Sequence, residues 1–168
     1  MSFPNPRETI ILGIDPGLVK TGWGVIKSQA NKISYVSCGV LTTSSSDSMG
    51  NRLAKIYNSV MTIIQEFQPI AIAIEQVFVN INPQTSQKLI MARSAALIAI
   101  TNSEYNAHEY TPNEIKKTIT GMGHSSKAQM YTMVKKICNC HLVKDGKTLT
   151  SDSIDALAVA ITNAFSSH

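Results

Sequence analysis

With 168 residues, of which 43% are hydrophobic and 15% charged, the chain is long enough to form one hydrophobic core without disulfide bonds. Its three cysteines are an odd number and no apolar stretch is long enough to cross a bilayer, which argues against a disulfide scaffold and predicts a cytoplasmic protein with no membrane partner. The net charge of +4 is unevenly distributed: residues 111–147 hold seven lysines and two acids, whereas residues 148–168 hold two acids and neither lysine nor arginine. This pattern suits a nucleic-acid enzyme, although a solvated lysine face has the same composition.

The N-terminal part of the chain begins with three predicted strands. Residues 9–15 are an apolar run that ends at an acid and is followed by Pro16-Gly17, which predicts a buried strand and a turn. Residues 21–27 and 32–42 follow at short spacing and predict two more strands, so the three strands form a meander.

Helices and strands alternate in the next part of the chain. Apolar residues recur at three- and four-residue steps from Leu53 to Phe67 and predict an amphipathic helix that Pro69 ends. Residues 70–75 predict a second buried strand that again finishes at an acid. A helix over residues 83–103 and a short strand near His108 follow.

Three helices are expected in the C-terminal part, each preceded by serine or threonine residues that can cap its first turn. The first helix runs to Gly121 and opens with a capping box and a proline at the first helical position. The second ends near residue 137. The capping residues are Thr111 with Glu114 for the first helix, Ser125 or Ser126 for the second, and Thr150 or Ser151 for the third.

This order of elements predicts an α/β fold. A meander followed by β-α-β units gives a mixed sheet of five strands with helices on its faces. We expect a single domain over residues 1–168, in which residues 1–7 are a flexible N-terminal extension.

Four acidic side chains fall where such a fold concentrates its chemistry. Asp15 and Glu75 each end a predicted strand, and parallel strands that are neighbours lie about 4.8 Å apart. Asp152 and Asp155 lie about 60° apart around the last helix, near its N-terminus and beside its apolar stripe. An aspartate before Pro-Gly is often only a turn former, and acids in a first helical turn often only complement the helix dipole, so no single acid is decisive.

Together the four acids predict a metal site for phosphodiester hydrolysis. Clustered carboxylates repel one another unless cations neutralise them, and four negative charges match two divalent ions. Oxygen ligands without cysteine or histidine favour Mg²⁺, for which Mn²⁺ can substitute, over Zn²⁺. Two such ions activate a water and stabilise the leaving oxygen of an in-line displacement. Zinc-binding residue types occur together at Cys138, Cys140 and His141, but no second pair of such residues completes a tetrahedral zinc site. We therefore interpret these three residues as structural.

The segments that carry these residues resemble, in chain order, the successive motifs of RuvC-type Holliday-junction resolvases. Gly-x-Asp-Pro-Gly alone is a weak signal that other ribonuclease-H-like proteins share, but Glu-Gln-Val-Phe and the terminal Asp-x-x-Asp-Ala-Leu-Ala stand in register with it. The similar segments are ILGIDPGLVKTGWGVI (11–26), AIEQVFVNIN (73–82), KLIMARSAALIA (88–99), EYTPNEIKKTITGMGHSSKAQM (109–130) and SDSIDALAVAIT (151–162).

The resemblance implies a ribonuclease-H-like fold and a homodimer that nicks two opposite strands of a four-way DNA junction symmetrically, in recombination and repair. The family's catalytic, metal-binding acids are matched by Asp15, Glu75, Asp152 and Asp155. Phe78 matches a DNA-binding aromatic that stacks at the opened junction centre, and Lys116 and Lys127 match lysines near the scissile phosphate. A branch-migration helicase complex of the RuvA and RuvB type is the implied partner.

The resemblance also identifies residues 83–103 as the helix through which two copies pair. Its small and apolar residues could form a close-packed interface or could face the domain's own sheet; they are Leu89, Ala92, Ala96, Ala99 and Ile100. Leu18-Val19 and Trp23 depart from the family, which usually has polar or basic residues and a tyrosine there, so the resemblance leaves the DNA contacts of the first loop open.

Three alternatives share part of this pattern. Gly-Ile-Asp-Pro-Gly also resembles the phosphate loop of actin-like ATPases and sugar kinases, which need a second domain that a chain of 168 residues cannot supply. A ribonuclease-H-like nuclease acting in RNA processing is the second, against which Glu-Gln-Val-Phe and the lysine-bearing segment argue. The third is a junction binder with a dead site, of which the four retained acids give no sign.

Overall fold

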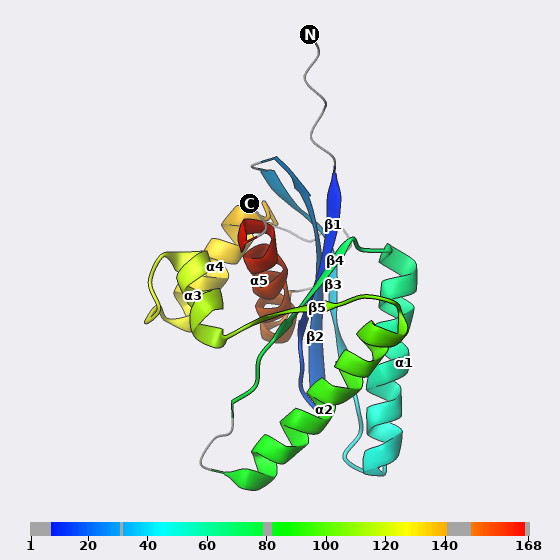
Figure 1. The fold of residues 1–168 in the computed structure, drawn as a ribbon. Coiled ribbons are helices and arrows are strands. Elements are labelled where there is room, and N and C mark those ends of the chain that lie inside the picture. Colours follow the sequence, from blue (N-terminus) through cyan, green and yellow to red (C-terminus); the bar gives the residue numbers. More distant parts are fainter. Residues whose placement is uncertain (1–7, 31, 79–81, 141–148, 167–168) are drawn as a thin grey trace.

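A mixed five-stranded sheet forms the middle layer of the fold, with the strand order β3-β2-β1-β4-β5 (Figure 1). The computed structural model describes residues 8–30, 32–78, 82–140 and 149–166. The first three strands are an antiparallel meander, β4 runs parallel to β1, and β5 runs parallel to β4. The strands are β1 (Thr9–Asp15), β2 (Lys20–Gln29), β3 (Lys32–Thr42), β4 (Ala71–Glu75) and β5 (Ala107–Tyr110). The predicted meander, mixed sheet and α/β class are confirmed, whereas the extension expected at residues 1–7 lies outside the described residues.

Helices cover both faces of this sheet (Figure 1). Helices α1 and α2 pack against each other on one face, and α3, α4 and α5 pack together on the other. The helices are α1 (Met49–Phe67), α2 (Pro83–Asn102), α3 (Pro112–Thr120), α4 (Lys127–Ile137) and α5 (Ser151–Ser166). Within the described ranges, none of them is both long and apolar enough to cross a membrane.

The central strand β1 is buried on both faces because its side chains alternate between two halves of the core. Ile11 packs on the side of α5, whereas Leu12 and Ile14 pack on the side of α1 and α2. A strand that is buried on both faces needs a continuous apolar run. The acid that ends this run, Asp15, therefore lies at the edge of the sheet.

Helix α5 approaches the sheet closely where glycines face it. A Cβ atom at Gly13 would lie 2.2 Å from the carbonyl oxygen of Ala156, and one at Gly22 would lie 2.0 Å from that of Asp152. Gly22 is the partner of Asp15 in the β1–β2 ladder. The absence of a side chain at Gly22 thus lets the first turn of α5 lie beside the end of β1.

Helix starts follow the capping chemistry. Thr111 and Ser126 form capping boxes at the starts of α3 and α4, and Thr150 exchanges hydrogen bonds with Ser153 at the start of α5. The apolar periodicity that predicted α1 first appears at Leu53, within the helix. The helix begins at Met49, because the Ser48 side chain caps it ahead of the apolar periodicity.

One face of α2 is buried inside the domain. The stripe proposed for pairing two copies is buried against the chain's own sheet at Ala92, Ala96, Ala99 and Ile100. The first of the two alternatives for this stripe is therefore wrong, and any contact with a second copy must use another face of the helix.

Candidate active site

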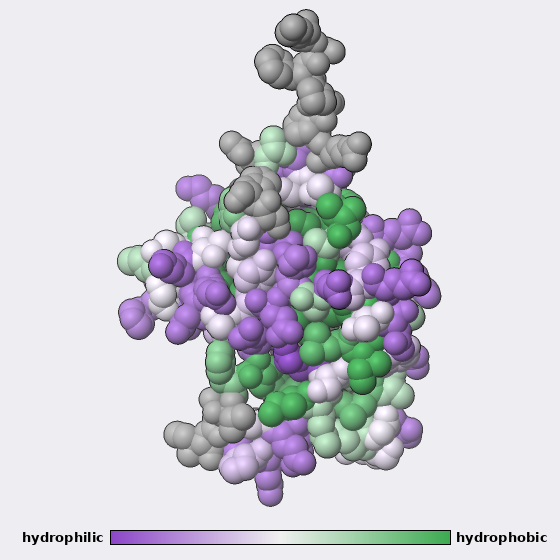
Figure 2. Space-filling view, in the orientation of Figure 1, coloured by the Kyte–Doolittle hydropathy of each residue, from purple (hydrophilic) through white to green (hydrophobic). Residues whose placement is uncertain are grey.

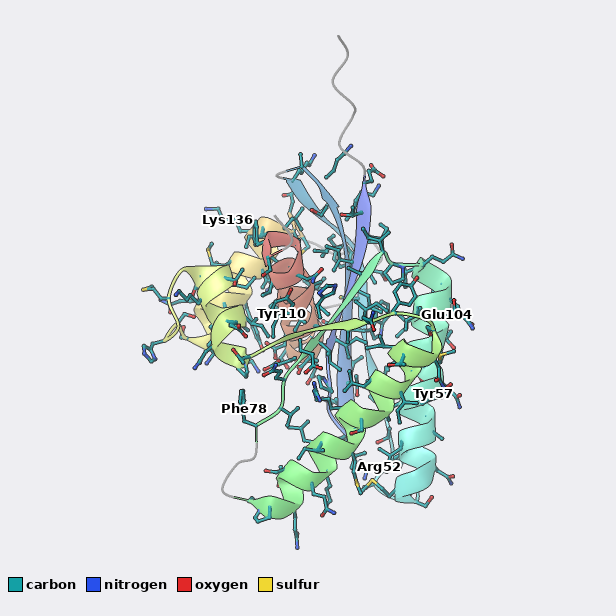
Figure 3. All side chains as sticks on the ribbon, viewed as in Figure 1. Arg52, Tyr57, Phe78, Glu104, Tyr110 and Lys136 are labelled. Atoms are coloured by element: carbon teal, nitrogen blue, oxygen red, sulfur yellow. The ribbon has the colours of Figure 1, made fainter. Side chains whose placement is uncertain are left out.

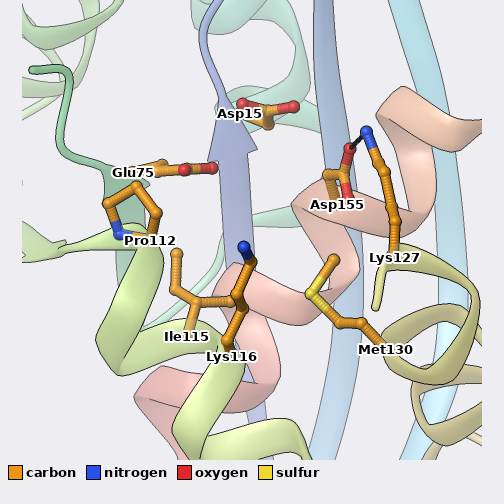
Figure 4. A pocket seen from close by; sticks show the side chains of 8 residues that line it. All are labelled: Asp15, Glu75, Pro112, Ile115, Lys116, Lys127, Met130 and Asp155. Atoms are coloured by element: carbon orange, nitrogen blue, oxygen red, sulfur yellow. Dashed lines mark ion pairs between the residues drawn. The ribbon is translucent and has the colours of Figure 1, made fainter. Parts of the chain in front are cut away.

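A cavity of about 380 Å³ lies where the carboxyl ends of β1 and β4 meet the N-terminal parts of α3, α4 and α5 (Figure 4). Its apolar lining comes from α3 and α4. Its charged lining consists of Asp15, Glu75, Asp155, Lys116 and Lys127. The fold thus brings three acids and two lysines from five separate elements into one space.

The sheet itself fixes the relation between the first two acids. Ile14 of β1 pairs with Ile74 of β4 in the parallel ladder, so Asp15 and Glu75 follow side by side at the same edge. The two carboxyl groups are close enough to share a hydrogen bond. This is the juxtaposition expected from two buried strands that each end at an acid.

Burial and mutual repulsion disfavour the charged forms of these acids. Burial, followed by the charges of Glu75 and Asp155, raises the pKa of Asp15 to about 8. The pKa of Glu75 is also raised, first by burial and then by Asp155, against the opposing effects of its hydrogen bond with Asp15 and of the two lysines. The cavity thus has three carboxyl groups against two lysines, and a bound cation would stabilise the ionised forms of these acids.

Asp155 is the acid that already has a cation beside it. Its Oδ2 atom lies 3.0 Å from the Lys127 ammonium and accepts a hydrogen bond of 3.3 Å from the Tyr131 hydroxyl. Burial raises the pKa of Asp155, and Lys127 opposes that rise. The pKa of Lys127 is raised by its hydrogen bond with Tyr131 and also by Asp155, so this lysine stays charged.

Asp152 stands at the margin of the site. It lies in the first turn of α5 and is half-buried, and its charge acts on both Asp15 and Asp155. It does not line the cavity. In the described part of the chain, no three acidic, histidine or cysteine side chains converge on a common metal position. Three of the four acids thus share the cavity, but their side chains are not arranged around one point.

The predicted DNA-contacting residues lie at different depths. Lys116 lines the cavity and its charge acts on Glu75. Phe78 is 55% exposed and stands off the domain on the segment that follows β4 (Figure 3). An aromatic side chain so exposed contributes little to the core and is free to contact a partner.

Tyr131 is a site residue that the sequence analysis missed. It follows Lys127 by four residues on α4, and side chains at that spacing share one face of a helix. The Lys127 ammonium lies 5.5 Å from the centre of its ring. The helical spacing from a lysine already singled out was the signal that could have found it.

The cysteines lie elsewhere. Cys138 and Cys140 are buried free thiols in the core beneath α5. His141 lies outside the described residues. Burial in the core is the behaviour expected of structural cysteines.

The family model described as crossover junction endodeoxyribonuclease RuvC matches residues 11–163. The chain belongs to the RuvC family. Proteins with that name from Rickettsia prowazekii and Rhodopseudomonas palustris are 42% and 41% identical to it, over 91% and 98% of this chain and 95% and 91% of theirs. Membership in a family of endonucleases decides against the ATPase and RNA-processing alternatives.

Solved structures agree with this assignment. The fold is similar to that of T. thermophilus RuvC in complex with a Holliday junction substrate, with a TM-score of 0.85 and 29% identity over 95% of this chain and 94% of that one. The yeast mitochondrial Holliday junction resolvase has a TM-score of 0.65 at 14% identity, covering 96% of this chain and 80% of its own, and shares the fold. The ribonuclease-H-like architecture is confirmed.

Proposed function

We propose that this protein resolves four-way DNA junctions by cutting two opposite strands symmetrically. The observation that carries the proposal is the cavity at the sheet edge, in which three carboxylates and two lysines lie together. Carboxylates suit divalent cations and lysines suit phosphates, so the same space can hold both parts of a phosphodiester reaction. The names of the relatives, and the junction bound to the T. thermophilus protein, support a junction as the substrate.

The donor set fits a hard divalent cation. Among the described residues that line the cavity, the anionic donors are carboxylate oxygens. The pKa of Asp15 is raised first by burial and then by the neighbouring carboxylates, and a bound cation would offset both effects. We assign Asp15, Glu75 and Asp155, with Asp152 at the margin, to two Mg²⁺ ions, for which Mn²⁺ can substitute. When bound, such ions activate water and neutralise charge that develops on the phosphate.

Two lysines and one aromatic side chain orient the DNA in this proposal. We assign Lys116 and Lys127, which line the same cavity from α3 and α4, to the scissile phosphate. Phe78 stacks on a base at the junction centre, a role for which its exposure suits it. Each of these groups positions the substrate and leaves the hydrolytic chemistry to the acidic edge of the sheet.

A second copy completes the enzyme, because paired cuts in a nearly two-fold junction need two sites. The outer face of α2 supports this assembly: Ile90 is 43% and Ile98 55% exposed. Both line an apolar groove of about 360 Å³ between α1 and α2, with Leu53 and Tyr57. Figure 2 shows hydrophobic side chains gathered over these two helices. We therefore assign the homodimer contact to this face.

The proposal extends to the setting of the enzyme. It describes one nuclease domain over residues 1–168, acting in the cytoplasm with a branch-migration helicase complex of the RuvA and RuvB type. Support for this setting comes from the family, whose members are named crossover junction endodeoxyribonucleases.

Incubation with a synthetic four-way junction and Mg²⁺ tests the proposed activity. We expect paired nicks at symmetric positions, no nicks in a linear duplex of the same sequence or in duplex RNA, and none with a chelator. Equal cutting of the linear duplex would contradict the proposed selectivity for junctions. Cutting that persists in the presence of the chelator would contradict the proposed requirement for a metal ion.

A further inference from the structure

The ion pair between Lys127 and Asp155 joins a fixed carboxylate to a cation that can leave (Figure 4). The side chain of Asp155 is 15% exposed, whereas that of Lys127 is 63% exposed. Lys127 is the first residue of α4, and Asp155 lies in the early part of α5. The carboxylate is thus held by its helix, while the ammonium reaches it on a long, solvated stem.

This ammonium contacts Oδ2, one of the two oxygens through which Asp155 could bind a divalent ion. Asp155 is one of the three acids of the cavity, and the described acidic side chains do not converge on a common metal position. Two cations at the same carboxylate oxygen repel each other strongly at short distance. Metal uptake at Asp155 and the ion pair with Lys127 therefore compete.

We propose that Lys127 is a displaceable counter-ion, which neutralises Asp155 until a divalent ion arrives and is then released to a DNA phosphate. The inference rests on the proposed function, because that function assigns Asp155 to the metal and Lys127 to DNA. An ion pair with one partner largely in solvent is weak, so a divalent ion can replace it.

Tyr131 is the positioning residue for this exchange. Its hydroxyl donates to the same Asp155 oxygen that Lys127 contacts, and its ring lies beneath the ammonium. When Lys127 leaves, the hydroxyl keeps the carboxylate turned toward the cavity.

The exchange couples metal binding to DNA binding. A phosphate that draws Lys127 away frees Asp155 for the metal, and a metal at Asp155 frees Lys127 for the phosphate. Linkage requires each ligand to strengthen the other by the same factor. The enzyme is therefore best supplied with metal when DNA is in place.

The Mn²⁺ affinity of the DNA-free protein tests the counter-ion role. We compare the wild type with Lys127→Met and with Lys136→Met by isothermal titration calorimetry, because methionine keeps the apolar stem and removes one positive charge. Lys136 is an exposed residue at the far end of the same helix (Figure 3). We expect Lys127→Met to bind Mn²⁺ about 3- to 10-fold more tightly and Lys136→Met to stay within about twofold of the wild type.

The outcomes separate this inference from the proposed function. If wild type and Lys127→Met bind Mn²⁺ equally, or if both variants gain the same affinity, Lys127 is not a specific counter-ion. If the wild type binds no Mn²⁺, the metal site itself fails and the inference fails with it. Asp155→Asn provides the internal control, since on this background Lys127→Met is expected to change the affinity by less than about twofold.

Lysine side-chain NMR on the unsubstituted protein gives a second measurement. The ring current of Tyr131 should displace the ε-methylene signal of Lys127 in the metal-free state. Titration with Mg²⁺ is expected to move that signal to the position of an exposed lysine and to leave Lys136 unchanged. A Lys127 signal that stays in place at saturating Mg²⁺ would overturn the release.

Discussion

The Asp15 carboxyl lies buried among like charges, and its contribution to stability depends on pH when no cation is bound. Its pKa is about 8 in the folded protein, against an ordinary value of 3.8. The folded state therefore holds the proton more tightly than the unfolded chain. Its stabilising contribution is complete below the ordinary value and is progressively lost as pH rises toward 8, because the unfolded state ionises first.

Asp15→Asn removes this ionisation and separates stability from function. In the presence of a chelator at pH 8, we expect the variant to unfold about 2–4 °C above the wild type, the shift that corresponds to about 1 kcal/mol in a chain of this size. At pH 5 the difference should shrink. Junction binding should persist while cutting falls at least about 1000-fold, because one metal ligand is lost.

Thermal unfolding at the two pH values and a junction-nicking assay check this prediction together. A melting temperature for the variant below that of the wild type at pH 8 would contradict the prediction that the ionised Asp15 carboxylate destabilises the metal-free protein. Undiminished cutting would contradict the assignment of Asp15 to the metal.

At the scale of elements, the site depends on how closely α5 packs on the sheet. The strand ends that carry Asp15 and Glu75 are fixed by the backbone ladder, but the acids of α5 are placed only by packing. The contact is backbone against backbone at Gly22, where the Asp152 carbonyl leaves no space for a Cβ atom. Of the glycines beneath α5, Gly22 is the one that faces the turn carrying Asp152, so the position of the helical acids is sensitive to it.

Gly22→Ala should therefore move the start of α5 away from β2. We expect a loss of about 1–3 kcal/mol in the free energy of unfolding, as for other overpacked cores, and a fall in cutting of at least about 10-fold. Denaturant unfolding and junction nicking measure the two effects. Gly50→Ala is the control: it lies in α1, nothing lies within 4 Å of its Cβ position, and it should leave cutting unchanged. Wild-type activity in Gly22→Ala would show that the close approach does not place the acids.

Sequence periodicity predicted the parts of this arrangement that local rules determine. Strand ends and capping residues follow from neighbouring residues, so the edge shared by Asp15 and Glu75 was predicted, as were the starts of α3, α4 and α5. The angle between Asp152 and Asp155 around a helix does not reveal how that helix packs on the sheet. The position of Asp152 at the margin of the site was therefore not predicted. Both faces of α2 are apolar, and only its packing shows which one is buried.

At the scale of the whole molecule, the exposed face of α2 determines whether two sites act together. Ile98→Glu places a charge in the apolar groove between α1 and α2, and we expect it to weaken the dimer by at least about 10-fold. Sedimentation equilibrium measures the assembly. On a cruciform plasmid, the variant should produce nicked circles where the wild type produces linear molecules.

Ile70→Glu is the matched control, since Ile70 is 65% exposed and lies before β4, outside the groove. It should remain dimeric and linearise the plasmid. If Ile98→Glu also remains dimeric, the assembly uses another surface.

Residues 76–82 are all that joins Glu75, at the cutting edge, to the first turn of α2. The exposed Phe78 lies on this short link. If two copies meet through α2, the catalytic edge, the aromatic side chain and the axis of the assembly follow one another along a single stretch of chain. Because β4 is paired within the sheet and α2 is packed on that same sheet, the core, and not the length of this segment, sets the distance between the two incisions. Lengthening the segment by a few residues should therefore weaken the contact of Phe78 with DNA and leave the spacing of the two cuts unchanged.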